Sequence, residues 1–189
     1  LPTDKPRPVV QTYRGAREEL VLPESLSESI EKLSREAGAT LFMTLLGAFI
    51  AMLHRYTQQQ DISVGSPIAG RNRVEIENLI GCFMNMLVLR ADLTDSPTFG
   101  GLLRRVREAA LGAYAHQELP FERLVEEIQP RRDLSRAPLF QVMFALNNNR
   151  QSWLEWEGVT FDVMIADSGT AKFDLVLWID STEKGLRGS

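Results

Sequence analysis

The segment from Thr40 to Tyr56 restricts the possible folds more than any other part of the sequence. Its apolar residues recur at helical spacing and cover most of the circumference of the helix that this spacing predicts. They are Leu41, Phe42, Leu45, Leu46, Phe49, Ile50 and Leu53. A surface helix keeps one polar face, so a helix this apolar must be buried on nearly all sides. We therefore predict that it lies at the centre of a layered domain.

The rest of the pattern predicts helices packed on a sheet. Apolar residues at helical spacing predict three more helices, over residues 26–37, 97–115 (with Ser96 as its cap) and 120–128. Short apolar or alternating runs predict strands over residues 61–65, 83–90, 140–146, 159–165 and 172–179. The run 83–90 is almost continuously apolar, so we expect it to be covered on both faces, and the polar segment 66–78 is predicted to be a loop. This order favours an α/β (α+β) two-layer sandwich, a mixed sheet with helices packed mainly on one face.

Composition excludes several classes of function. The 21 Lys and Arg residues against 25 Asp and Glu give a net charge of -4, which makes nucleic acid a poor partner. One cysteine and two histidines supply neither an internal disulfide nor a zinc ligand set, so no metal site is predicted. The longest apolar stretch, Leu41 to Leu53, is shorter than the roughly 18 residues of a membrane span. We therefore expect a cytoplasmic protein that does not enter the membrane.

The two ends of the chain suggest a piece of a longer polypeptide. The chain begins at Leu1 without a methionine, and it stops just after a strand-like run. Residues 1–14 carry three prolines, which predicts an extended, poorly packed lead-in.

The residues that could act in catalysis stand in unfavourable contexts. His116, at the end of a predicted helix, is either a general base or a side chain that bonds the last carbonyls of its helix. The second interpretation is favoured, because no Ser, Cys or Asp stands beside it as a relay partner. His54 is expected on an exposed turn, and Cys82 is expected to pack as a small hydrophobic residue rather than act as a nucleophile. Since Ser66 and Ser168 lack the Gly-x-Ser-x-Gly context, no catalytic residue is assigned.

The charged segment 131–136 (RRDLSR) allows two interpretations. Its guanidinium groups could bind a phosphate, such as that of a pantetheine arm. Alternatively it is a salt-bridged loop in which Asp133 and Ser135 satisfy local backbone donors and Arg136 pins the following strand. The structural interpretation is favoured.

Two other polar features lie upstream. Arg71 and Arg73 are expected to be solvated or paired with Glu75 and Glu77 rather than to bind a ligand. Asn85 is an amide inside an apolar strand, and such a group needs hydrogen-bond partners when buried. It either ties a neighbouring loop or faces a cavity, and the sequence does not decide between these alternatives.

Three segments resemble successive signature motifs of nonribosomal peptide synthetase condensation domains. They are 80–90 (IGCFMNMLVLR), 116–122 (HQELPFE) and 132–139 (RDLSRAPL). The motif residues are Gly81, Phe83, Arg90, His116, Gln117, Pro120, Phe121, Glu122, Arg132, Asp133, Ser135, Arg136 and Pro138. Segments 1–8 and 171–175 are also similar to the family, so the resemblance covers nearly the whole chain. The departures are mild, at Cys82, Met84, Met86, Glu118 and Ala137.

The resemblance implies a chloramphenicol-acetyltransferase-like lobe. The family's His-His-x-x-x-Asp-Gly motif lies in an N-terminal lobe, and this sequence holds no adjacent His pair. We therefore expect residues 1–189 to be a C-terminal lobe alone, with the N-terminal catalytic lobe absent. By resemblance, the complete domain forms peptide bonds between donor and acceptor thioesters carried on 4'-phosphopantetheine arms. This lobe would supply a tunnel wall, with Asn85 and Ser66 as candidate contacts to substrate or pantetheine, and no cofactor bound directly.

The same resemblance implies the partners. They are the N-terminal lobe, donor and acceptor peptidyl carrier proteins, and an adjacent adenylation domain. Segment 66–78 resembles the family's floor loop, and the strands after Phe140 resemble the region where a latch crosses to the other lobe. The alternatives are an epimerization-domain lobe, a noncatalytic carrier-binding module, and an acyltransferase that uses His116.

Overall fold

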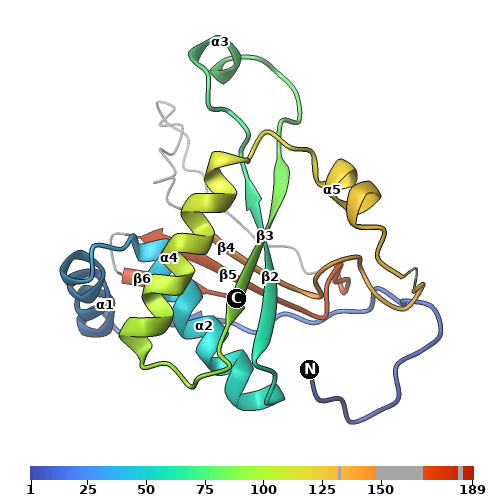
Figure 1. The fold of residues 1–189 in the computed structure, drawn as a ribbon, viewed down its shortest axis with the longest axis horizontal. Coiled ribbons are helices and arrows are strands. Elements are labelled where there is room, and N and C mark those ends of the chain that lie inside the picture. Colours follow the sequence, from blue (N-terminus) through green and yellow to red (C-terminus); the bar gives the residue numbers. More distant parts are fainter. Residues whose placement is uncertain (132, 148–167, 183–184) are drawn as a thin grey trace, which may run out of the picture.

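The computed structural model describes residues 1–131, 133–147, 168–182 and 185–189 (Figure 1). Its strands are β1 (Leu20–Val21), β2 (Asp61–Ile68), β3 (Asn85–Asp92), β4 (Val142–Asn147), β5 (Leu175–Thr182) and β6 (Gly185–Gly188). Its helices are α1 (Glu24–Glu36), α2 (Leu41–Thr57), α3 (Val74–Glu77), α4 (Phe99–Ala115) and α5 (Phe121–Ile128). Helices α1, α2 and α4 lie over one face of the sheet in Figure 1. The predicted α/β architecture, with helices mainly on one face, is confirmed.

The strands of the described residues form one mixed sheet in the order β1-β6-β5-β4-β2-β3. Strand β2 pairs antiparallel with β3 along its whole length and parallel with β4 on its other side. Strand β4 pairs parallel with β5, and β6 runs antiparallel to both β5 and β1. Chain segments far apart in the sequence are therefore neighbours in the sheet.

Helix α2 lies against the centre of the sheet, as its apolar circumference predicts. Leu46 and Ile50 on this helix are 0% and 1% exposed, and Phe144 on β4 is 0% exposed. The Phe144 ring lies 5.3 Å from that of Phe42 and 5.9 Å from that of Phe49, between centroids. Burying one such side chain contributes about 1.5–3 kcal/mol, so this contact between α2 and β4 is a main source of stability.

Strand β3 differs from the expectation in position and in burial. It begins at Asn85, two residues after the predicted start at Phe83. Leu87 and Leu89 are buried, but Arg90 on the other face is exposed. The prediction that both faces are covered is therefore wrong, because the helices lie on one face only. Cys82 precedes the strand and is exposed, so its predicted packing as a small hydrophobic residue is wrong as well.

Other elements differ in smaller ways. Helix α4 begins at Phe99, and Thr98, not Ser96, is its N-cap, since the Thr98 hydroxyl accepts the Gly101 N–H at 3.3 Å. Strand β2 continues to Ile68, and the helical turn α3 interrupts the predicted loop. The short strands β1 and β6 were not expected from the sequence pattern. The strand predicted over residues 159–165 lies outside the described residues.

No single helix among the described residues is long and apolar enough to cross a membrane. Helices α1 and α2 pass that criterion only as a pair bent by 106°, and α2 is largely buried in the domain. The described residues also contain no cluster of three or more His, Cys, Asp or Glu side chains that could hold a metal ion.

Candidate functional site

Asn85 joins the first two motif segments directly. It is the first residue of β3, and its side-chain Nδ2 donates to the carbonyl oxygens of Gln117 at 3.0 Å and Leu119 at 2.7 Å. Its Oδ1 accepts the backbone N–H of Phe121 at 3.0 Å. The amide thus satisfies three backbone groups of the turn between α4 and α5. Of the two alternatives for Asn85, the structure shows the one in which it ties a neighbouring loop.

A second contact joins the same turn to the loop after β2. The Asn72 side chain donates to Oε1 of Glu118 at 3.2 Å, and Arg73 lies 3.7 Å from the same oxygen. Arg73 therefore pairs with Glu118 rather than with Glu75 or Glu77, which corrects the expectation. All three side chains are exposed or half-buried, so the pair alone is worth little.

Arg71 holds the loop after β2 in shape. Its guanidinium donates to backbone carbonyls at the end of α3 and beyond, namely those of Ile76, Glu77 (3.0 Å), Leu79 (2.9 Å) and Gly81 (3.1 Å). The same group stacks 4.5 Å above the centre of the Phe83 ring. Arg71 is therefore neither solvated nor paired with the acidic residues of α3, because backbone carbonyls occupy its donors. The motif residues Gly81 and Phe83 are two of its partners.

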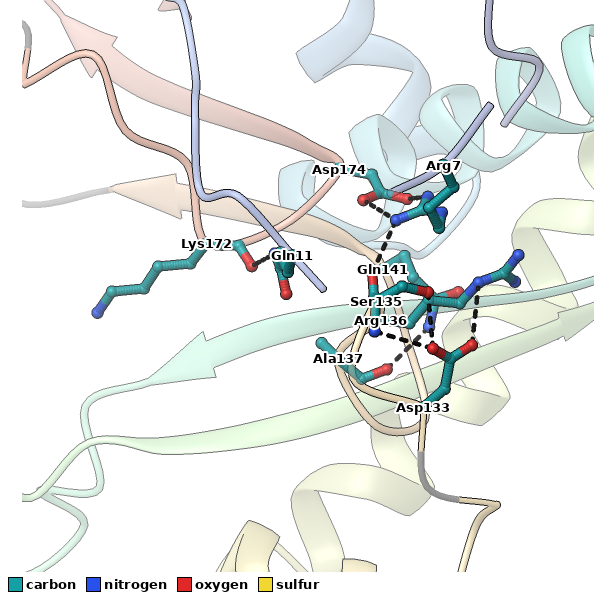
Figure 2. Close-up of polar contacts among 9 residues, drawn as sticks. All are labelled: Arg7, Gln11, Asp133, Ser135, Arg136, Ala137, Gln141, Lys172 and Asp174. Atoms are coloured by element: carbon teal, nitrogen blue, oxygen red, sulfur yellow. Dashed lines mark hydrogen bonds and ion pairs between the residues drawn. The ribbon is translucent and has the colours of Figure 1, made fainter. Parts of the chain in front are cut away.

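The third motif segment forms a local polar turn (Figure 2). Oδ1 of Asp133 accepts the backbone N–H of Ser135 at 2.8 Å and the Ser135 hydroxyl at 2.6 Å. Nε of Arg136 lies 3.7 Å from Oδ2 of Asp133. The structural interpretation of this segment is confirmed for these residues, except that Arg136 pairs with Asp133 and not with the following strand. Arg132 lies outside the described residues.

A row of aromatic rings connects the second motif segment with the region after the third. The Phe140 ring lies 5.6 Å from that of Phe121 and 5.3 Å from that of Phe173, between centroids. Phe140 is 2% exposed and packs directly against the backbone of Gly65 in β2. The segments around these four residues are thus fixed together by one buried ring.

The remaining motif residues have structural positions. Arg90 forms a two-point ion pair with Asp61 across β2 and β3, with both N–O distances 2.8 Å. Pro120 precedes the first residue of α5, and Glu122 lies in the first turn, where a negative charge is favourable. The Pro138 carbonyl accepts the N–H of Phe140 at 2.8 Å.

The N-terminal segment is extended, but it is not poorly packed. Arg7 forms a two-point ion pair with Asp174, and its Nη1 also donates to the Ser135 carbonyl at 3.0 Å (Figure 2). Gln11 donates from its backbone to the Leu134 carbonyl at 3.0 Å. Its proline content suggested a loose lead-in. The expectation fails because these contacts are made by polar groups with residues more than 120 positions away.

A groove of about 2400 Å³ lies between this N-terminal segment and the sheet. Met84, Met86, Met143 and Trp178 line it on the sheet side. Asn85 and Ser66 are not among the residues that line the groove, and Ser66 is 3% exposed. Their contact with substrate or pantetheine stays a prediction.

The histidines and serines considered for catalysis are not assembled into a relay. His116 is exposed, and its backbone N–H bonds the Ala113 carbonyl, but its imidazole makes no hydrogen bond with the part of the chain that the structure describes. Nδ1 of His54 lies 2.7 Å from the carbonyl of Gln59, at the end of α2. Ser168 Oγ lies 2.8 Å from Oγ1 of Thr170. The described residues therefore bring no nucleophile and base together.

The turn at Asp133 makes a titration prediction. The Ser135 hydroxyl and then the Ser135 N–H hold the pKa of the Asp133 carboxyl below its ordinary value. This carboxylate therefore stabilises the fold above its ordinary pKa, and the contribution is lost as pH falls through the lowered folded-state value. We expect Ser135→Ala to raise the pKa of Asp133 toward its ordinary value in a carboxyl NMR titration. Ser29→Ala, which removes a hydroxyl on exposed α1, is the control and leaves it unchanged; an unshifted pKa in Ser135→Ala would contradict the assignment.

Comparison with known proteins identifies the family. The sequence profile of the family described as "Condensation domain" matches residues 1–188. One of the proteins that make up the linear gramicidin synthase of Brevibacillus parabrevis is 52% identical over 192 residues, covering 100% of this chain. The chain spans only 4% of that relative's length.

Solved structures agree with the sequence comparison. The X-domain from teicoplanin biosynthesis superimposes with a TM-score of 0.90 at 26% identity, covering 100% of this chain and 44% of its own. A four-domain nonribosomal peptide synthetase bound to AMP and glycine shares the fold, with a TM-score of 0.89 at 23% identity over 99% of this chain and 15% of its own. The fold expected from the signature motifs is thus present, and the chain belongs to the condensation-domain family of nonribosomal peptide synthetases.

Proposed function

We propose that the chain is the C-terminal lobe of a condensation domain and takes part in peptide-bond formation without supplying the reacting groups. One observation carries the proposal: three family motif segments are joined by structural contacts around Asn85 and Phe140, and no catalytic pair lies among the described residues. The sequence also contains no adjacent His pair. A lobe of this kind contributes shape and docking surface, while the base lies elsewhere.

The extent of the structural match supports a lobe rather than a whole domain. All of this chain superimposes on less than half of the teicoplanin X-domain chain. One continuous sheet and one core account for the described residues. The described residues therefore form a single packing unit that corresponds to part of a larger domain, and a second lobe would complete the active site.

The partners follow from the reaction. An amide bond forms when the acceptor amine attacks the donor thioester carbonyl, the C–S bond breaks, and the amine proton is lost to a base. Donor and acceptor peptidyl carrier proteins would present these groups on 4'-phosphopantetheine arms, with an adenylation domain adjacent in the same synthetase. The groove beside the N-terminal segment offers this lobe's own apolar surface to such an arm.

Complementation tests the proposal. The chain is assayed with donor and acceptor aminoacyl carrier proteins, alone and mixed with a separately made N-terminal lobe of its parent. We expect no dipeptide above background from the chain alone and formation of the dipeptide on mixing. His116→Ala is the matched variant, and it leaves the product yield of the mixture unchanged. Turnover by the chain alone that His116→Ala abolishes would instead support an acyltransferase that uses this histidine.

A folded mixture that still makes no product would support the noncatalytic binding module. In that case the chain would bind carrier proteins without promoting a reaction. Inversion of a carrier-bound residue by the mixture would support an epimerization-domain lobe. The two results are separated by analysing the chirality and the length of the thioester-bound product.

A further inference from the structure

We propose that residues 7–15, here called the clasp, set the position of one wall of the groove, and that Arg7 is a positioning residue for carrier-bound substrate. This inference rests on the proposed function. It concerns a segment that the sequence pattern predicts to be loosely packed and that none of the three motif segments includes.

Arg7 is the centre of the clasp (Figure 2). Its guanidinium bonds Asp174 through two nitrogens and donates to the carbonyl oxygen of Ser135 at 3.0 Å. The side chains of Arg7 and Asp174 are 26% and 21% exposed, so this pair is shielded from water more than an ordinary surface pair. One side chain thereby holds together the turn of the third motif and the start of β5. Lysine cannot reproduce this geometry, because its ammonium lacks the planar fork.

Gln11 repeats the same connection four residues later. Its backbone N–H donates to the carbonyl of Leu134 at 3.0 Å, and its side-chain Nε2 donates to the carbonyl of Lys172 at 2.9 Å. Figure 2 shows Gln11 beside Lys172, on the same stretch of chain that leads to Asp174. Two side chains of the clasp therefore bridge the same two loops.

The end of the clasp lies against the chain before β5. The N–H of Ala171 donates to the carbonyl of Tyr13 at 2.8 Å, and the N–H of Gly15 donates to the carbonyl of Gly169 at 2.9 Å. A Cβ atom at Gly15 would lie 2.7 Å from the Cβ of Ala171, so the approach is too close for any side chain. This close contact fixes the clasp along its length.

Polar contacts, not burial, hold the clasp in place. Val9 and Val10, between Arg7 and Gln11, are 86% and 57% exposed. The apolar side chains of the segment thus contribute little to its attachment. Because residues 1–8 and 11–20 line the groove, release of the clasp moves an entire wall relative to Met143 and Trp178 on the sheet. A shifted wall leaves the substrate bound in less productive positions, which raises KM more than it lowers kcat.

The test compares Arg7→Met with Arg105→Met in the intact synthetase module that contains this chain. Arg105 is a matched control, because it donates to the Asp95 carboxylate and to the Asp92 carbonyl, both at 2.7 Å, and its side chain is 30% exposed. It belongs to α4 and does not line the groove. We expect Arg7→Met to speed proteolytic cleavage within residues 7–15 and to raise KM for carrier-bound substrate, each by about fivefold or more, with kcat within about twofold. Arg105→Met is expected to change neither.

The outcomes separate the inference from the proposed function. A wild-type module that forms no peptide bond contradicts the proposed function. An active wild-type module in which Arg7→Met leaves cleavage unchanged, or speeds cleavage and leaves KM unchanged, overturns the positioning role. Arg7→Lys gives a further readout: it keeps the charge but not the two-point geometry, so we expect KM between those of the wild type and Arg7→Met. Full activity of Arg7→Lys would show that charge alone suffices and would contradict the clasp geometry.

Discussion

Gly65→Ala is expected to destabilise the domain by about 1–3 kcal/mol or more, the usual range for overpacking a filled core. The added Cβ would lie 2.1 Å from Cε2 and 2.3 Å from Cζ of the Phe140 ring. That ring is 2% exposed and is held between Phe121 and Phe173, so it cannot turn into solvent. The strand or the ring must therefore move, and either movement disturbs the contacts that join the motif segments.

Denaturant unfolding of the purified chain measures this effect, and two further variants calibrate it. Gly112→Ala is the control, because a Cβ at this position in α4 meets nothing within 4 Å. Helix propensity makes that variant more stable by about 0.5–1 kcal/mol, the opposite sign. Gly65→Ala combined with Phe140→Leu removes the clash, so the double variant is expected to be more stable than the sum of the two single changes predicts. Strict additivity, or a Gly65→Ala variant as stable as the wild type, would contradict the packing described for this site.

The sequence was sufficient to predict the elements whose burial is strongly periodic. Helix α2 is apolar on most of its circumference, and it lies at the centre as expected. Helix α5 is found where its apolar side and Pro120 predict it. These elements are decided by local spacing and by the hydrophobic effect, both of which can be read from neighbouring residues.

Elements decided by distant partners were missed. Strand β1 has two residues, and its pairing with β6 brings Leu20 and Val21 beside Gly188 and Arg187. Neither strand is long enough to show a period. The start of α4 was misplaced for a related reason: Ser96 and Thr98 are both good caps, and Ser96 adopts a left-handed turn conformation with φ of 48°.

The same distinction applies to the candidate site. The motif segments were found from their residues, and the polar turn at Asp133 follows from its own short-range chemistry. The ties made by Arg71 and Arg7 were not found, since both donate to backbone carbonyls, which every residue possesses. An arginine within a proline-rich segment was the only signal for the clasp, and it does not identify an acceptor more than 120 positions away.

Asn85 carries the second large prediction, because its side chain satisfies three backbone groups of a motif turn. Asn85→Ala removes the bonds to the carbonyls of Gln117 and Leu119 and to the N–H of Phe121. At about 0.5–1.5 kcal/mol for each net hydrogen bond, we expect a loss of roughly 2–3 kcal/mol in the free energy of unfolding. Faster hydrogen exchange of the Phe121 amide is expected to accompany it, because that amide loses its acceptor.

Asn85→Asp is nearly isosteric and separates hydrogen bonding from packing. One oxygen of the introduced carboxyl still accepts the N–H of Phe121, but the other now faces two carbonyl oxygens where an NH₂ group donated. This repulsion raises the folded-state pKa of the introduced carboxyl above its unfolded value. The folded state then binds more protons between the two pKa values, so the variant gains stability as pH falls through that window.

The pH dependence is isolated by subtracting the unfolding free energy of Asn85→Ala from that of Asn85→Asp at each pH. The alanine variant carries no titratable group at this position and shares every other carboxyl of the chain. We expect the difference to favour Asn85→Asp increasingly as the solution is acidified, and to level off below the unfolded-state pKa of the introduced carboxyl, about 3.9. A difference that does not change with pH would show that Nδ2 is not the donor to Gln117 and Leu119. The motif turn would then be held by packing of the Asn85 side chain alone.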